Sequence, residues 1–202
     1  MTTIEADHYL LPALAEVLED QPVRVIGSDV RTVDWDDVLA GAGTWALVAN
    51  LPYNLATSIV LDVLAEVPRV RRLLVMVQRE VGERLAAPAG SRTYGIPSVL
   101  VALRARAEVV GRVSPEVFLP RPRVESALVR IERLDEPATD ADPVLLVELV
   151  RQAFGNRRKM LRRSLDGRVT EAQFLAAGIA SDTRPEQLDI AAWGALAKAV
   201  TG

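Results

Sequence analysis

The run Asn50-Leu51-Pro52-Tyr53-Asn54 is a stiff turn between two segments of different periodicity. Trp45 to Ala49 precedes it as an apolar run typical of a buried strand, and Leu55 to Val67 follows with apolar residues at helical spacing. Proline lacks an N–H group and restricts the residue before it, so few backbone shapes are open to this turn. The pattern predicts a turn at the carboxyl end of a strand, where open α/β sheets bind their ligands.

The turn also carries groups that suit one kind of chemistry. The Asn50 side-chain oxygen and a neighbouring backbone carbonyl can accept hydrogen bonds from an exocyclic amino group, and the Tyr53 ring can stack on a base. Adenine N6 is a poor nucleophile because its lone pair is delocalised, but two acceptors that hold its hydrogens aim that lone pair at an electrophilic methyl group. The motif indicates N-methylation of a base, although Asn-x-Pro also begins ordinary loops.

Alternation of strand and helix extends from residue 1 to about residue 133 and predicts a doubly wound α/β sheet. Strands are expected at residues 1–7, 23–29, 45–49, 72–78, 108–113 and 124–133, and helices at 10–18, 35–39, 55–67, 79–85 and 97–106. An acidic, proline-containing stretch at 135–142 is typical of a linker, and the apolar patterns beyond it are helical. The expected organisation is an α/β domain at 1–134, a linker at 135–142 and a small helical domain at 143–202.

Composition excludes several classes of protein. The 202 residues are 50% hydrophobic and 25% charged, as in globular proteins, and no apolar run approaches a membrane span or a signal sequence, so a cytoplasmic location is expected. With no cysteine and one histidine, disulfides and the usual zinc and iron–sulfur ligand sets cannot form, and no metal is expected. The net charge of −3 argues against a uniformly basic nucleic-acid binder.

Glu5 and Asp29 each end a predicted strand. An acid at such a position binds ribose hydroxyls in nucleotide-binding folds, and Asp29 could instead accept from an adenine amino group or simply cap the next turn. A glycine-rich loop normally precedes such an acid, but none precedes Glu5. Gly41 and Gly43 come before a strand and predict a loop, not a cofactor cradle.

Two segments gather basic side chains. Phe118 to Val124 forms a stiff basic loop between two strands, and Phe118 is either a core anchor or the residue that closes the second face of a flipped base opposite Tyr53. The stretch 154–165, expected to be helical, belongs to a strongly basic region with one acid, Asp166, between residues 151 and 168. In an acidic chain this cluster indicates phosphate binding, with a solvated helix face as the alternative.

Four stretches of the chain resemble the small-subunit (16S) ribosomal RNA adenine N6,N6-dimethyltransferase family (KsgA type). The stretches are Asn50-Leu51-Pro52-Tyr53-Asn54, Gln78 to Leu85, Val117 to Ala127 and Phe154 to Arg162. The resemblance implies a Rossmann-like sheet that uses S-adenosyl-L-methionine to dimethylate two adjacent adenines near the 3′ end of small-subunit rRNA, and it implies a monomer acting on the pre-30S particle.

The resemblance also implies roles for individual residues. Asn50 and the Pro52 carbonyl would hold the target N6, and Tyr53 and Phe118 would sandwich its ring. The full implied set is catalytic residues Asn50, Leu51, Pro52, Tyr53 and Phe118; cofactor contacts from Glu5, Asp29, Val30 and Asn50; and RNA contacts from Arg92, Arg121, Arg123, Arg157, Arg158, Lys159, Arg162 and Arg163.

The resemblance is incomplete at the N-terminus. Members of the family begin with a cofactor-binding segment, a first strand and a Gly-x-Gly-x-Gly loop, whereas Met1 falls where the family is already in its second strand. We therefore expect an N-terminally truncated sheet with two strands lacking a neighbour, and weak cofactor binding or none. Two alternatives stay open: a non-catalytic RNA-binding or ribosome-assembly module, such as a decaying paralogue, and a large-subunit rRNA adenine methyltransferase, whose family shares the catalytic turn.

Overall fold

The computed structural model describes residues 1–41 and 43–202, so Ala42 of the predicted Gly41–Gly43 loop lies outside the described residues. The strands are β1 (Thr2–Glu5), β2 (Arg24–Gly27), β3 (Trp45–Asn50), β4 (Val70–Gln78), β5 (Ala105–Val113) and β6 (Ser126–Arg133). The helices are α1 (Leu11–Val17), α2 (Trp35–Val38), α3 (Ala56–Glu66), α4 (Arg79–Leu85), α5 (Ile96–Arg104), α6 (Pro143–Gly155), α7 (Leu161–Ser164), α8 (Glu171–Ala176) and α9 (Ile190–Thr201), with 3-10 turns η1 (Pro115–Val117) and η2 (Pro185–Gln187). The predicted α/β alternation up to residue 133 is confirmed.

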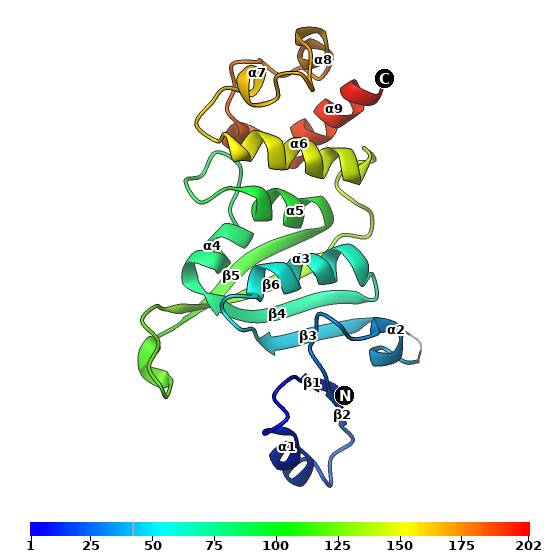
Figure 1. Cartoon of the computed structure of the whole chain (residues 1–202), viewed down its shortest axis with the longest axis vertical. Helices are drawn as coiled ribbons and strands as arrows, with labels where there is room; N and C mark the ends of the chain where they lie inside the picture. Colours follow the sequence, from blue (N-terminus) through cyan, green and yellow to red (C-terminus); the bar gives the residue numbers. More distant parts are fainter. Residues whose placement is uncertain (42) are drawn as a thin grey trace.

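The strands form two separate sheets (Figure 1). A four-stranded mixed sheet has the order β3-β4-β6-β5, in which β3 and β4 are parallel and β6 runs antiparallel to both of its neighbours. The second sheet contains only the parallel pair β1 and β2. Ile4 of β1 and Ile26 of β2 pack against the main core, which holds the small sheet to the large one.

One face of the large sheet carries the main core. Helix α3 covers it with a buried stripe that includes Ile59, Val60 and Val63, packed in one cluster with Leu73 and Val75 of β4. Burial of each such side chain stabilises the fold by roughly 1.5–3 kcal/mol. This well-packed face of the sheet therefore supports the turn after β3.

The opposite face of the sheet is open at β3. Val48 is 75% exposed and Leu74 of β4 is 38% exposed, and the side chains of β3 alternate between half-buried and exposed. The prediction of a buried strand at Trp45 to Ala49 is therefore wrong for one of its two faces. The apolar run resembles a central strand, but in this structure β3 is an edge of its sheet.

A second core joins the C-terminal helices to α5. Leu146, Phe174 and Trp193 are fully buried in it together with Leu103 of α5, so α5 lies between the sheet and the helices (Figure 1). The buried Tyr94 hydroxyl donates to the Leu188 carbonyl at 2.9 Å, which ties the loop before α5 to the segment before α9.

The stretch 154–165 is not one helix as predicted. Helix α6 ends at Gly155, and the residues from Asn156 to Lys159 form a turn before α7 begins. Gly and Asn are poor helix formers, and the Asn156 N–H closes the helix by donating to the Ala153 carbonyl at 3.1 Å. The basic run Arg157–Lys159 is thus presented on a turn.

Among the described residues, no helix combines the length and the apolar character needed to cross a membrane.

Candidate active site

The Asn50–Asn54 turn leaves the carboxyl end of β3, as its sequence predicts. The Leu51 N–H donates to the Met76 carbonyl at 3.1 Å, which extends the ladder with β4 by one residue, and Leu51 is buried. The Pro52 carbonyl accepts from the Leu55 N–H at 3.0 Å, and its second lone pair remains free for a ligand. Asn50 is exposed, so its amide can reach a bound molecule.

Tyr53 is held by a residue that the sequence pattern did not single out. Its hydroxyl and that of Ser126 are 2.8 Å apart, and Ser126 is fully buried at the start of β6. Ser126 pairs with Gln78 on one side and with Val113 on the other. The only signal in the sequence was a small polar residue among the apolar residues of a predicted strand, which is too common to identify a role.

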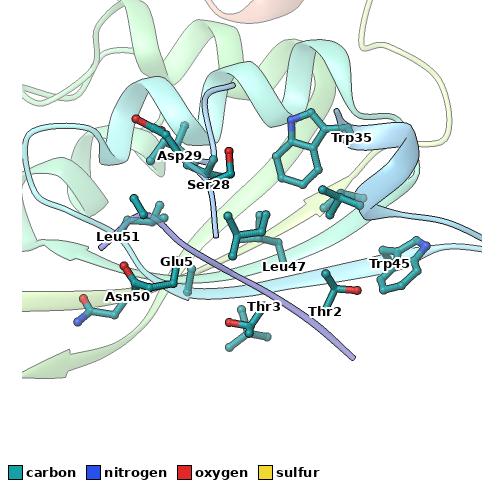
Figure 2. Close-up of a pocket in the computed structure, with 18 of the residues that line it drawn as sticks. Thr2, Thr3, Glu5, Ser28, Asp29, Trp35, Trp45, Leu47, Asn50 and Leu51 are labelled. Atoms are coloured by element: carbon teal, nitrogen blue, oxygen red, sulfur yellow. The ribbon is translucent and has the colours of Figure 1, made fainter. Parts of the chain in front are cut away.

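A cavity of about 350 Å³ lies between β1 and β3. The four predicted cofactor contacts Glu5, Asp29, Val30 and Asn50 all line it. Figure 2 shows Glu5 and Asn50 toward one end, with Trp45 at the other end and Asp29 above. The structure thus brings together residues that are far apart in the sequence, and the polar ones gather where the strands end.

The two acids of the cavity differ in how much of each carboxylate is free. One Glu5 oxygen accepts from the Asp7 N–H at 2.8 Å, which leaves the other oxygen for a ligand. Both Asp29 oxygens accept from the Arg31 guanidinium, and one also accepts from the Arg31 N–H at 2.9 Å. The side-chain hydrogen bond from Arg31 is the main reason that the pKa of Asp29 falls to about 2. Asp29 therefore stabilises the turn after β2, one of the two roles considered for it, and stays ionised.

The charged side chains that line the cavity are acidic, and most of the others are apolar. No lysine, arginine or histidine stands among the described residues that line the cavity. Around the acids, the walls are formed by apolar side chains such as Val30, Leu47 and Ile59. Within residues 1–41 and 43–202, no group of three or more histidine, cysteine or carboxylate side chains is arranged to hold a metal ion.

The loop that carries Phe118 projects from the sheet between β5 and β6 (Figure 1). Phe118 is half-buried and belongs to neither buried cluster of the described residues, so the core-anchor interpretation gains no support. No ring contact between Phe118 and Tyr53 occurs in the described part of the chain. Leu119 beside it is 99% exposed. The sandwich of Tyr53 and Phe118 remains a prediction.

The predicted RNA contacts separate into two kinds. Arg157 is half-buried: its guanidinium donates to the Arg92 carbonyl at 2.9 Å and lies 3.9 Å from a Glu186 oxygen. Arg157 thereby connects the turn after α6 to the loop before α5. The remaining predicted contacts have exposed side chains, and they are Arg92, Arg121, Arg123, Arg158, Lys159, Arg162 and Arg163.

Comparison with known proteins gives a consistent result. A family model described as "Ribosomal RNA adenine dimethylase" matches residues 1–201. Ribosomal RNA small subunit methyltransferase A of Acidothermus cellulolyticus is 40% identical over 211 residues, which cover 98% of this chain and 71% of the relative. The protein of the same name from Sphingopyxis alaskensis is 42% identical over 205 residues, which cover 98% of this chain and 74% of the relative.

Two solved structures share the fold. The crystal structure of the 23S rRNA methyltransferase ErmE superposes with a TM-score of 0.72 at 23% identity and covers 100% of this chain and 82% of its own. A dimethyladenosine transferase from Plasmodium falciparum superposes with a TM-score of 0.76 at 18% identity, covering 96% of this chain and 79% of its own. At these identities the likeness concerns the fold.

Proposed function

Because the chain belongs to the ribosomal RNA adenine dimethylase family, we propose that it is an S-adenosylmethionine-dependent methyltransferase that dimethylates N6 of adenines in small-subunit rRNA. The observation that carries the proposal is the Asn50–Asn54 turn at the carboxyl end of β3, beside a cavity lined by Glu5 and Asp29. The proposed target is the pair of adjacent adenines near the 3′ end, the proposed setting is the pre-30S particle in the cytoplasm, and the enzyme is proposed to act as a monomer.

The lining residues fit the nucleoside half of the cofactor. The free oxygen of Glu5 suits ribose hydroxyls, and the apolar side chains around Val30 suit a purine ring. Negative charge at this end also suits a cationic ligand, and bound S-adenosylmethionine supplies a methyl group activated by its sulfonium charge. No cationic side chain stands among the described lining residues, so the donors that they offer to the methionine carboxylate are backbone N–H groups and uncharged side chains such as Ser28.

The residues of the turn are proposed to act by orientation. The Asn50 side-chain oxygen and the free lone pair of the Pro52 carbonyl hold the two N6 hydrogens, which turns the nitrogen lone pair away from the purine ring. Tyr53 offers its ring face to the base while its hydroxyl is fixed by Ser126 at 2.8 Å. Phe118 is proposed to close the other face after the exposed 118–124 loop moves onto RNA.

Small-subunit rRNA is favoured over large-subunit rRNA by the relatives. Those at 40% and 42% identity carry the small-subunit name over 98% of this chain, whereas ErmE, named for 23S rRNA, is 23% identical and supports the fold alone. Each candidate substrate can be offered to the purified chain with labelled S-adenosylmethionine. Label in N6,N6-dimethyladenosine of small-subunit RNA supports the proposal, and label only in large-subunit RNA contradicts it. The Asn50→Ala variant should lose transfer by at least about a hundredfold if two acceptors orient N6.

RNA binding without methyl transfer would favour the second candidate, a non-catalytic RNA-binding module. The observation behind this candidate is that β1 and β3 share no ladder, so the cavity lacks a continuous backbone wall. The binding face is tested separately by changing Arg158, Arg162 and Arg163 together to alanine, which should weaken binding and reduce the slope of log affinity against log salt by about 2. A charge-matched control replaces three exposed arginines of the sheet, namely Arg72, Arg106 and Arg112. If both triple variants lose affinity equally, the region after α6 is not the RNA-binding face.

A further inference from the structure

Leu119 belongs to the loop that projects from the sheet between η1 and β6 (Figure 1). Among the described residues, no large apolar side chain is more exposed than that of Leu119, at 99%, and Val117 beside it is 69% exposed. Single exposed leucines are common on protein surfaces, so the setting of this one decides what it can do.

The loop returns to the sheet directly beside the catalytic turn. The Arg79 N–H donates to the Glu125 carbonyl at 2.9 Å, and the Arg79 guanidinium donates to the Glu125 carboxylate at 2.6 Å. The next residue, Ser126, is the one whose hydroxyl lies 2.8 Å from that of Tyr53. The base of the loop is therefore fixed to the residue that is proposed to stack on the target adenine.

The backbone of the loop directs Phe118 and Leu119 to opposite sides. Phe118 is extended, with φ −107° and ψ 144°, and Leu119 precedes a proline, which favours an extended backbone there as well. Consecutive side chains of an extended chain point in opposite directions, and their burial agrees, because Phe118 is half-buried and Leu119 is exposed. When Phe118 faces a base held on the turn, Leu119 faces away from that base.

We propose that Leu119 is a wedge, which enters the gap that an adenine leaves in the RNA base stack when it turns into the active site. The inference rests on the proposed function and adds a residue that contacts the RNA beside the target base. Unstacking opposes base flipping, and an apolar side chain in the gap restores contact with the neighbouring bases. A leucine has no hydrogen-bonding group, so it would act on the stack and not on the identity of a base.

The charges around Leu119 favour RNA over an apolar protein surface. Arg121 and Arg123 follow it with exposed side chains, and phosphate groups lie on either side of any gap in a base stack. The ion pair between Arg121 and Glu116 is 3.5 Å long and exposed, so it is weak and leaves the guanidinium available.

The test measures the affinity of the full chain for three kinds of RNA by fluorescence anisotropy at one salt concentration. The first is a hairpin that reproduces the 3′ end of small-subunit rRNA with its two adjacent adenines. The second is the same hairpin with an abasic residue in place of one or the other adenine. The third is a fully paired duplex of equal length.

Leu119→Ala should weaken binding of the intact and the abasic hairpins by about tenfold and leave duplex binding unchanged. Phe118→Ala should weaken binding of the intact hairpin only, because an abasic residue offers no ring to stack on. Leu119→Met keeps an apolar side chain of similar length and should bind like the native chain. Leu175→Ala, which truncates a leucine that is 81% exposed on α8, is the matched control and should change nothing. The urea midpoint of Leu119→Ala should equal that of the native chain, since the side chain is fully exposed.

Unchanged hairpin binding by Leu119→Ala overturns the wedge, and so does an equal loss of affinity for hairpin and duplex. A loss seen with pre-30S particles but not with the naked hairpin also overturns it and assigns Leu119 to a protein contact. If methyl transfer to small-subunit RNA is observed in any of these cases, the proposed function stands and the wedge alone fails. If the native chain binds the hairpin no more tightly than the duplex and transfers no methyl group, both proposals fail.

Discussion

The hydrogen bond between Tyr53 and Ser126 couples the turn after β3 to the start of β6. Ser126 is fully buried and Tyr53 is half-buried, and their hydroxyl oxygens are 2.8 Å apart. Removing the hydroxyl of Tyr53 and removing that of Ser126 should therefore destabilise the fold by different amounts. Tyr53→Phe leaves a fully buried serine hydroxyl without its partner, whereas Ser126→Ala leaves the hydroxyl of a half-buried tyrosine without its partner.

The expected magnitudes follow from this difference in burial. A buried hydroxyl left without a partner costs about 1–3 kcal/mol, so Tyr53→Phe should lower the free energy of unfolding by that amount. Ser126→Ala should cost only about 0.5–1.5 kcal/mol, because hydration replaces the lost bond. The double variant removes both hydroxyls and should cost less than the sum of the two single changes by about 1 kcal/mol.

Urea unfolding of the four proteins, followed by tryptophan fluorescence and by circular dichroism, measures these energies. Tyr9→Phe provides a matched control, because the Tyr9 side chain is 80% exposed and far along the chain from Ser126. The reasoning is refuted if the two single changes add fully in the double variant, or if Ser126→Ala is the more destabilising of the two. In the proposed reaction, Ser126→Ala should also slow methyl transfer by loosening the ring of Tyr53.

Three further predictions concern stability. Burial, with a smaller contribution from a nearby carboxylate, raises the pKa of Tyr94 to about 12. In the unfolded state this tyrosine ionises first, near pH 10, so the free energy of unfolding should fall by about 2–3 kcal/mol as pH rises from about 10 to about 12. In urea titrations, Tyr94→Phe should reduce this pH dependence, whereas the control Tyr9→Phe should leave it unchanged. Gly82→Ala would put a methyl group 2.9 Å from a buried Val129 methyl and should lower the urea midpoint by a net loss of about 1 kcal/mol or more. Arg133 donates to four backbone carbonyls around the end of α3, so Arg133→Met should cost about 3 kcal/mol in the same assay, and an unchanged midpoint would show that water replaces those bonds.

The order of the elements and the position of the turn could be predicted because both depend on local sequence. Pro52 and the change from strand to helical periodicity placed the Asn50–Asn54 turn at the end of β3, where it lies. Glu5, Asp29 and Asn50 line one cavity, and their grouping into one site is implied by the family resemblance, whereas the sequence pattern alone places each of them at the end of a strand. Local patterns thus suffice to place a residue at the end of a strand.

Pairings across the chain could not be predicted in the same way. Ser126 lies 73 residues from Tyr53, and nothing in its neighbourhood distinguishes it from other strand serines. Arg157 was grouped with exposed basic residues, but in the structure its guanidinium binds the Arg92 carbonyl, so its truncation should disturb the loop before α5 as well as RNA binding. The difference between Arg157 and Arg158 appears only when the turn after α6 is folded against that loop.

The wrong prediction for β3 concerns the burial of its side chains, whereas its lack of a second neighbouring strand is expected from the incomplete N-terminal resemblance. An apolar run such as Trp45 to Ala49 is typical of a central strand, which has a neighbouring strand on each edge and is covered on both faces. In this structure β3 has β4 on one edge and, among the described residues, no hydrogen-bonded strand on the other, and Val48 is exposed. A sequence suited to the centre of a sheet therefore overstates the burial of a strand that lies at the edge.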